Sequence, residues 1–132
     1  MSARPDRPVS AIMSWPVATI DHDATVQEAA EALAADNIGA LLVTRDEALV
    51  GIISERDVVA HIALGTHLHH LSVGEVMAGE VVTVQPDTPI LDAARAMAGA
   101  EVRHLPVLDG DLIAGVVSMR DLIDVLTGAV KS

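Results

Sequence analysis

The chain has 132 residues, of which 51% are hydrophobic and only one, Trp15, is aromatic. A chain of this length can bury a core as a single compact domain, but its formal net charge of −11 and its lack of aromatic stacking platforms argue against nucleic-acid binding. The absence of cysteine excludes disulfides and thiolate chemistry, and no apolar run reaches the ~18 residues of a membrane span. We therefore expect a soluble, cytoplasmic protein that contacts neither nucleic acid nor membrane.

The chain contains an internal duplication. An offset of 64 residues aligns residues 9–65 with residues 73–129 without a gap, and 15 of the 57 aligned pairs are identical. Residues 1–8 carry two prolines and three charges and are predicted to be a disordered lead-in, and residues 66–72 are predicted to be the linker. Because a copy of about 60 residues leaves one apolar face uncovered, we expect the copies to pack about a pseudo-twofold axis.

Each copy is predicted to form a short helix, a strand, a helix, two strands and a final helix. In the first copy, the capping box Thr25-Val-Gln-Glu28 opens an Ala-rich helix that continues to about Asp36. Two runs rich in Leu and β-branched residues, 40–44 and 49–53, predict a hairpin around a polar turn. The final helix is predicted to begin at Ser54.

The second copy is predicted to repeat these elements. Here Asp87-Thr88-Pro89 places a helix cap and a first-turn proline at the point where the first copy has its capping box. Residues 104–108 and 112–117 predict the hairpin, and the final helix is expected to start at Ser118.

A motif of the form Gly-h-h-Ser-x-Arg-Asp, where h is hydrophobic, occurs at residues 51–57 and 115–121. It leads from a strand to a helix N-terminus, where backbone N–H groups, a hydroxyl and a guanidinium could hold a phosphate and the carboxylate could accept from a ribose diol. The alternative is simple helix capping, for which Ser72-Val-Gly-Glu75 is a second example in the chain. The residues alone leave both interpretations open.

The duplicated pattern Val-x-x-x-Met, Val-x-Thr-h-x-x-Asp and Gly-h-h-Ser-x-Arg-Asp closely resembles the cystathionine-β-synthase (CBS) domain, and two in tandem resemble a Bateman module. The resemblance covers residues 9–129. It implies an α+β fold of two β-α-β-β-α repeats, paired through their sheets to leave two clefts. It also implies a homodimer, and regulatory binding of AMP, ADP, ATP or S-adenosylmethionine in place of catalysis.

Site residues follow from this resemblance position by position. Asp57 and Asp121 would bind ribose, and Ser54, Arg56, Ser118 and Arg120 would lie near phosphate. The base would lie among backbone and aliphatic groups at Ala18, Ile38, Gly39 and Ala40 in the first copy and at Val82, Val102, Arg103 and His104 in the second.

The resemblance further implies that each cleft combines the two copies, so that Asp121 faces residues 38–40 and Asp57 faces residues 102–104. On that arrangement the cleft of Asp57 would gain Arg103 and His104 and prefer more highly phosphorylated ligands. The cleft of Asp121 would have only Arg120 nearby.

No catalytic motif supports an enzyme: the chain has neither a Walker-type phosphate loop nor a Gly-x-Ser-x-Gly elbow. We expect a free-standing sensor that requires no cofactor and acts on a separate effector protein. The alternatives are a structural dimerisation module and a metal-binding protein. The metal candidates are four histidines around the linker, namely His61, His67, His69 and His70; His22, between two aspartates, is interpreted as a turn residue.

Overall fold

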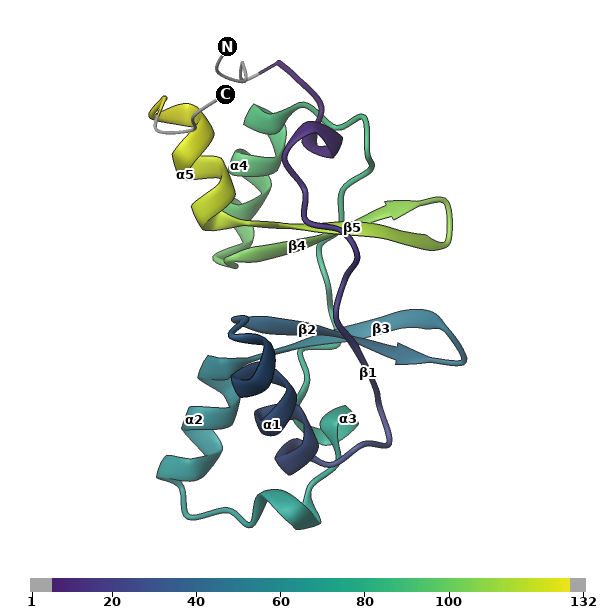
Figure 1. Cartoon of the computed structure of the whole chain (residues 1–132), viewed down its shortest axis with the longest axis vertical. Helices are drawn as coiled ribbons and strands as arrows, with labels where there is room; N and C mark the ends of the chain where they lie inside the picture. The colour runs from purple at the N-terminus through teal and green to yellow at the C-terminus, as the bar shows by residue number, and fades with distance from the viewer. Residues whose placement is uncertain (1–5, 129–132) are drawn as a thin grey trace. The chain divides into compact units, whose positions relative to one another are not determined.

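The computed structural model describes residues 6–128, which form two compact units (Figure 1). The first unit consists of residues 18–81, and the second unit of residues 82–128 together with 6–17. Each unit contains helices and a β-sheet, so the predicted α+β class is confirmed. Residues 1–5 of the predicted lead-in and residue 129, the predicted end of the second repeat, lie outside the described residues.

The first unit is a three-stranded sheet in the order β1-β2-β3, with β1 parallel to β2 and β2 antiparallel to β3. Figure 1 shows α1 and α2 against one face of this sheet. In chain order its elements are β1 (Thr19–Asp21), α1 (Val26–Asp36), β2 (Ala40–Arg45), β3 (Ala48–Ser54), α2 (Glu55–Ala63), the 3-10 helix η2 (Leu68–His70) and α3 (Val73–Val76).

Helix α1 begins where its capping box predicts, because the Thr25 side chain accepts a hydrogen bond from the Glu28 backbone N–H at 3.0 Å. Its apolar residues recur at helical spacing, so they form one buried face that packs on the strands. The core of the first unit consists of Val26, Ala29, Leu33, Leu41, Val43, Ile53, Val58 and Val73. Burying each Val, Leu or Ile side chain contributes about 1.5–3 kcal/mol.

The second unit repeats this plan with a two-stranded antiparallel sheet, β4-β5, and the helices α4 and α5 (Figure 1). Its elements are η1 (Val9–Ala11), α4 (Ile90–Ala100), β4 (His104–Asp109), β5 (Leu112–Ser118) and α5 (Met119–Leu126). Both predicted hairpins and both predicted final helices are therefore confirmed.

The first strand predicted for the second copy is reduced to a single parallel bridge between Val84 and Val107 in the described part of the chain. In the first unit, the N–H groups of His22 and Leu42 extend the β1–β2 ladder by donating to Thr44 and Ala18. The second copy has Pro86 and Pro106 at these two positions, and proline has no N–H to donate. The missing donors explain the shortened strand.

The predicted capping of α4 is wrong in detail. Pro89 is the N-cap residue and makes no side-chain capping bond, while the Thr88 hydroxyl accepts from the Gln85 backbone N–H at 3.0 Å. The N–H of Ile90 donates instead to the carbonyl of Arg7 at 2.8 Å. A residue from the predicted lead-in thus satisfies the helix N-terminus.

The beginning of each repeat packs on the other repeat's core residues. Val9 is fully buried in the core of the second unit, and its N–H donates to the Thr88 carbonyl at 2.8 Å. Correspondingly, Val73 is fully buried in the core of the first unit, and its N–H donates to the Ala24 carbonyl at 2.7 Å. The compact units therefore do not follow the repeat boundaries at 9–65 and 73–129.

The motif glycines permit this exchange. Ser14 pairs with Val116 through hydrogen bonds of 2.8 and 3.2 Å, and a Cβ added at Gly115 would lie 2.9 Å from the Ser14 carbonyl oxygen and 2.7 Å from Met13 Sδ. In the first unit, a Cβ added at Gly51 would lie 2.8 Å from the carbonyl oxygen of Ala78, which belongs to the segment that begins the second repeat. Only glycine allows the crossing backbone to approach this closely.

Among the described residues, no helix has both the length and the apolar character that crossing a membrane requires.

Candidate functional site

The Ser-x-Arg-Asp motif of the first unit forms the N-terminus of α2. The Ser54 Oγ accepts from the Asp57 backbone N–H at 3.2 Å, and the Asp57 Oδ2 accepts from the Ser54 backbone N–H at 2.8 Å. The Ser54 hydroxyl also donates to Asp57 Oδ2 at 3.0 Å. The backbone N–H groups of Ser54 and Asp57, which have no helical carbonyl to bond to, are both satisfied by side chains. The capping interpretation is therefore confirmed here.

The second motif forms the same box at the N-terminus of α5. Ser118 Oγ accepts from the Asp121 N–H at 3.1 Å, and Asp121 Oδ2 accepts from the Ser118 N–H at 2.9 Å. In both boxes the engaged carboxylate oxygen is Oδ2. Because a carboxylate offers about four lone-pair sites on two oxygens, the capping role leaves acceptor capacity for a ligand hydroxyl.

In the first unit, the residues expected near the base adjoin the motif of the same unit. Ala40 pairs with Ser54 across the β2–β3 hairpin, and the Gly39 carbonyl accepts from the Glu55 N–H at 2.9 Å. Ile38 packs against the core of this unit, and the carbonyl of Ala18 accepts a hydrogen bond from the Leu42 backbone N–H in β2 at 3.2 Å.

The second unit has the same arrangement with different side chains. His104 pairs with Ser118 across the β4–β5 hairpin, and the Arg103 carbonyl accepts from the Met119 N–H at 2.7 Å. Val102 packs against the core of this unit, whereas Val82 is exposed.

An open cavity of about 420 Å³ lies at this point of the second unit. It is lined by Arg103, His104, Ser118, Met119, Arg120, Ile123 and Asp124. Arg103 and His104 thus line the same cavity as Ser118 and Arg120 within this unit, while the pairing of Asp121 with residues 38–40 and of Asp57 with residues 102–104 stays a prediction. The hairpin register explains the proximity: residues 104 and 118 are directly opposed at its open end.

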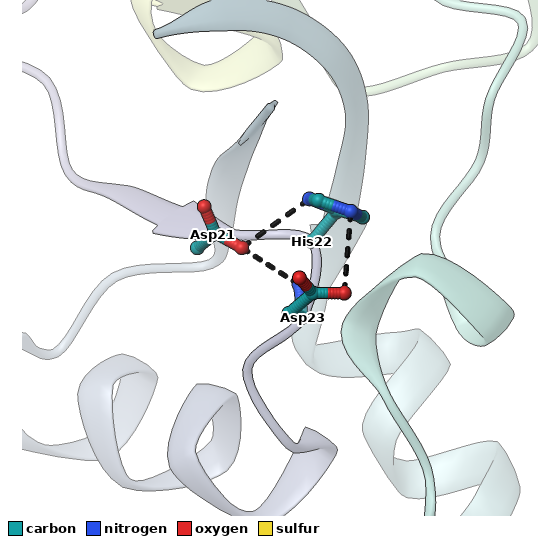
Figure 2. Close-up of side chains that lie close together, drawn as sticks. All are labelled: Asp21, His22 and Asp23. Atoms are coloured by element: carbon teal, nitrogen blue, oxygen red, sulfur yellow. Dashed lines mark hydrogen bonds and ion pairs between the residues drawn. The ribbon is translucent and has the colours of Figure 1, made fainter. Parts of the chain in front are cut away.

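A cluster of two carboxylates and one imidazole ends β1 (Figure 2). The ring nitrogens Nδ1 and Nε2 of His22 each lie 3.2 Å from a carboxylate oxygen, of Asp21 and Asp23 respectively. The Asp23 N–H donates to Asp21 Oδ1 at 2.8 Å. This last bond closes an Asx-type turn, which agrees with the interpretation of His22 as a turn residue.

The linker histidines do not form a group of three or more converging ligands in the described part of the chain, where the only such group is the one at residues 21–23. The His67 and His70 rings are near each other, with centroids 5.8 Å apart. His61 lies in the last turn of α2, and His69 lies within η2. The metal-binding alternative at these histidines therefore lacks the convergent geometry that a zinc site needs.

Comparison with known proteins agrees with the motif and the fold. The family model of the CBS domain matches residues 9–64 and 73–128. The chain therefore belongs to the CBS domain family, as a tandem pair of the Bateman type.

Relatives support the assignment over most of the chain. It is 33% identical over 110 residues to the CBS domain-containing protein YhcV of Bacillus subtilis, a match covering 83% of this chain and 79% of YhcV. The CBS domain pair of protein MJ0100, solved in complex with 5′-methylthioadenosine and S-adenosyl-L-methionine, superposes with a TM-score of 0.86 at 27% identity, covering 96% of this chain and 100% of the other. For PAE2072 from Pyrobaculum aerophilum, solved with AMP, the TM-score is 0.81 at 25% identity, with coverage of 91% and 98%.

Proposed function

We propose that this protein is a regulatory module that binds an adenosine-containing ligand, of the class AMP, ADP, ATP or S-adenosylmethionine, at the Ser-x-Arg-Asp motifs. The observation that carries the proposal is the cavity of the second unit, where the motif meets Arg103 and His104. A binding role that requires no cofactor and no catalysis is consistent with this set of side chains. Occupancy of the site would be read by a separate effector protein.

The chemistry of the motif suits a nucleoside. The Asp57 and Asp121 carboxylates, held in place by their capping boxes, can accept hydrogen bonds from a ribose diol. Arg56 and Arg120 follow the N-cap serines at helix N-termini, where guanidinium and backbone N–H groups favour anions. The complexes of MJ0100 with two adenosine compounds and of PAE2072 with AMP support the same ligand class for this chain.

The direct test is thermal unfolding of chelator-treated protein with adenosine, AMP, ADP, ATP and S-adenosylmethionine in separate samples. A ligand at 100 times its Kd stabilises the folded state by about 2.7 kcal/mol, which corresponds to a rise in Tm of roughly 5–15 °C for a domain of this size. Guanosine and GMP serve as controls, because they share the ribose but not the base. An unchanged Tm with every adenosine compound would refute the proposal.

We further propose that the module is a homodimer formed through its helices. Val59 and Ile62 on α2 are 60% and 57% exposed, and Ile123 and Leu126 on α5 are 52% and 41% exposed. Apolar side chains at helical spacing on an outer face are typical of a protein–protein contact, and a second copy of the chain presents the same faces. This dimerisation role is compatible with ligand binding and is tested separately below.

A further inference from the structure

The Asp-His-Asp cluster at residues 21–23 offers donor atoms that its turn does not use. The Asp23 backbone N–H closes the turn on Asp21 Oδ1, and neither ring nitrogen of His22 takes part in that bond. Nδ1 lies 3.2 Å from Asp21 Oδ1, and Nε2 lies 3.2 Å from Asp23 Oδ1. Figure 2 shows both carboxylates reaching the same ring. Two carboxylates and one imidazole thus converge from three consecutive residues.

The protein does not balance the negative charge of this cluster. A neutral imidazole has one N–H and one lone pair, so one of the two contacts sets a nitrogen lone pair against a carboxylate oxygen. Nδ1 is buried and makes no hydrogen bond to any described residue. Within residues 6–128, no arginine pairs with Asp21 or Asp23 either. A cation held between the ring and the carboxylates would remove this repulsion.

The spacing of the donor atoms is that of ligands around one metal ion. Zn²⁺ binds imidazole nitrogen and carboxylate oxygen at about 2.0–2.2 Å, so two of its ligands lie about 2.8–3.5 Å from each other. The two contacts of 3.2 Å fall in this range, and one donor atom from each residue lies within 4.8 Å of the other two. Asp23 is 85% exposed, so rotation of its side chain can shorten the longest of these distances.

Backbone contacts on both sides hold His22, the central ligand, in place. Its N–H donates to the Thr44 carbonyl of β2 at 2.9 Å, and its carbonyl accepts from the Gly74 N–H of α3 at 2.8 Å. A Cβ added at Gly74 would lie 3.8 Å from the ring atom Cδ2, so the ring lies against the start of α3. The imidazole is only 21% exposed, whereas the linker histidines at 67, 69 and 70 are exposed. A ligand that is already fixed loses less conformational entropy when it binds a metal.

We propose that residues 21–23 bind a divalent transition-metal ion, represented by Zn²⁺, with His22 and the two aspartates as ligands and water in the remaining positions. One nitrogen and two oxygens suit Zn²⁺ or Ni²⁺, whereas Mg²⁺ and Ca²⁺ prefer oxygen ligands alone. Because His22 bonds to both β2 and α3, the bound ion fixes the end of β1 against the segment that begins the second repeat. The site is structural, and it does not depend on the proposed binding of adenosine compounds.

The experiment is calorimetric titration of the chelator-treated full chain with ZnCl₂, together with thermal unfolding of the same samples. A pH of about 7.5 keeps carboxylates ionised and free imidazole largely neutral. Zinc is expected to bind the wild-type chain and to raise its Tm, because an ion that binds only the folded state stabilises it. His22→Ala is expected to weaken this binding by at least about 10-fold, since even the outer partners of a metal ligand contribute roughly 10- to 100-fold to affinity. Mg²⁺ and Ca²⁺ should leave the Tm unchanged.

Two matched controls separate this site from other histidines and other acidic groups. Asp46→Asn removes an exposed carboxylate from the turn between β2 and β3, and it should leave zinc affinity unchanged. The second control replaces all the linker histidines that are exposed, and it should also keep the site: His67→Ala, His69→Ala and His70→Ala.

Asp23→Asn covers the case in which His22→Ala fails to fold. Because Asp23 is largely exposed, this variant should keep the wild-type Tm in chelator while its zinc binding weakens. Wild-type protein that binds no zinc, or zinc affinity that is the same in wild type and Asp23→Asn, would overturn the proposal. So would loss of binding in the linker variant, or an effect of Asp46→Asn as large as that of Asp23→Asn. None of these results alters the Tm response to adenosine compounds, so the proposed function is judged separately.

Discussion

The motif aspartates are observed to cap helices and are proposed to bind the ligand with the same side chain. Asp121 accepts from the Ser118 N–H at the start of α5 and, as proposed, from the ribose of the ligand. Asp121→Ala is expected to lower stability by about 0.5–2 kcal/mol through the lost cap and to weaken ligand binding roughly 5- to 150-fold. Asp121→Asn keeps an acceptor for the cap, so stability is expected to change less than affinity. Calorimetry and thermal unfolding on both variants check this.

A capping box outside the motif provides the matched control. Glu75 accepts from the Ser72 N–H at 2.7 Å at the start of α3 and has no arginine beside the box. Glu75→Ala should therefore lower Tm and leave ligand affinity as it was. A loss of affinity in this variant equal to that of Asp121→Ala would mean that capping, and not contact with the ligand, explains the effect.

The motif glycines are predicted to be irreplaceable for steric reasons. Gly115→Ala places a Cβ 2.9 Å from the Ser14 carbonyl oxygen, and overpacking of this kind costs about 1–3 kcal/mol. Gly99→Ala is the control, since a Cβ there meets nothing within 4 Å and Gly99 lies within α4; it should be neutral or stabilising by up to about 1 kcal/mol. Denaturant unfolding of the two variants measures the difference, and equal stability would refute the close-approach argument.

At this scale the sequence predicted candidate site residues but not which of them adjoin within a unit. Capping at Ser54 and Ser118 could be predicted because it depends on residues three apart. The proximity of Arg103 to Arg120 depends on hairpin register, which the strand pattern and turn already contained. The cross-copy pairing implied by the resemblance concerns a cleft between the repeats, so it does not follow from hairpin register and stays a prediction.

At the scale of elements, α3 carries a pH-dependent cap. Hydrogen bonds from the Ser72 backbone N–H and hydroxyl lower the pKa of Glu75 below its ordinary value of 4.5. A carboxyl with a lowered folded-state pKa stabilises the fold above its unfolded pKa, and this contribution is lost as pH falls through the folded value. The Tm difference between wild type and Glu75→Gln is therefore expected to shrink as pH is lowered from 6 to 3. A difference that stays constant over this range would contradict the assignment.

Most helices and strands could be predicted because local patterns specify them. The hairpins follow from runs rich in Leu and β-branched residues around polar turns, and both were found within one or two residues of the predicted bounds. The missing strand at Val84 was not predicted, although Pro86 and Pro106 were visible in the sequence. The strand predicted from the hydrophobic pattern was wrong here, because that pattern does not show that the two prolines lack the backbone N–H groups that a ladder needs.

At the scale of the whole molecule, the proposed dimerisation through the helices can be tested by measuring the molecular mass in solution. Light scattering at protein concentrations of tens of micromolar is expected to give the mass of two chains. Ile62→Glu and Ile123→Glu each put a charge on an exposed apolar helix face and should shift the protein towards the monomer. Leu112→Glu is the control, because Leu112 is 74% exposed in the β4–β5 hairpin and away from the helices. A monomer mass for wild type, with and without ligand, would refute the dimer.

The exchange of segments between repeats could not be predicted from this sequence. Val9 and Val73 occupy equivalent positions of the two copies, so the apolar pattern is satisfied whether each segment packs on its own copy or on the other. The choice depends on chain geometry at the crossing, where Gly51 and Gly115 receive the neighbouring backbone. Because the two copies share one apolar pattern, the sequence does not indicate which copy each segment packs on.

This exchange also sets an order of events during synthesis on the ribosome. The first unit is continuous, so all of its residues have been made once residue 81 has emerged. Residues 6–17 are made before the first unit but find their partners after it, since Val9 bonds to Thr88 and Arg7 to Ile90, some 80 positions later. Because contacts between distant positions form slowly, the nascent chain carries Val9 uncovered while the first unit folds, and the leading segment docks only when the second half arrives.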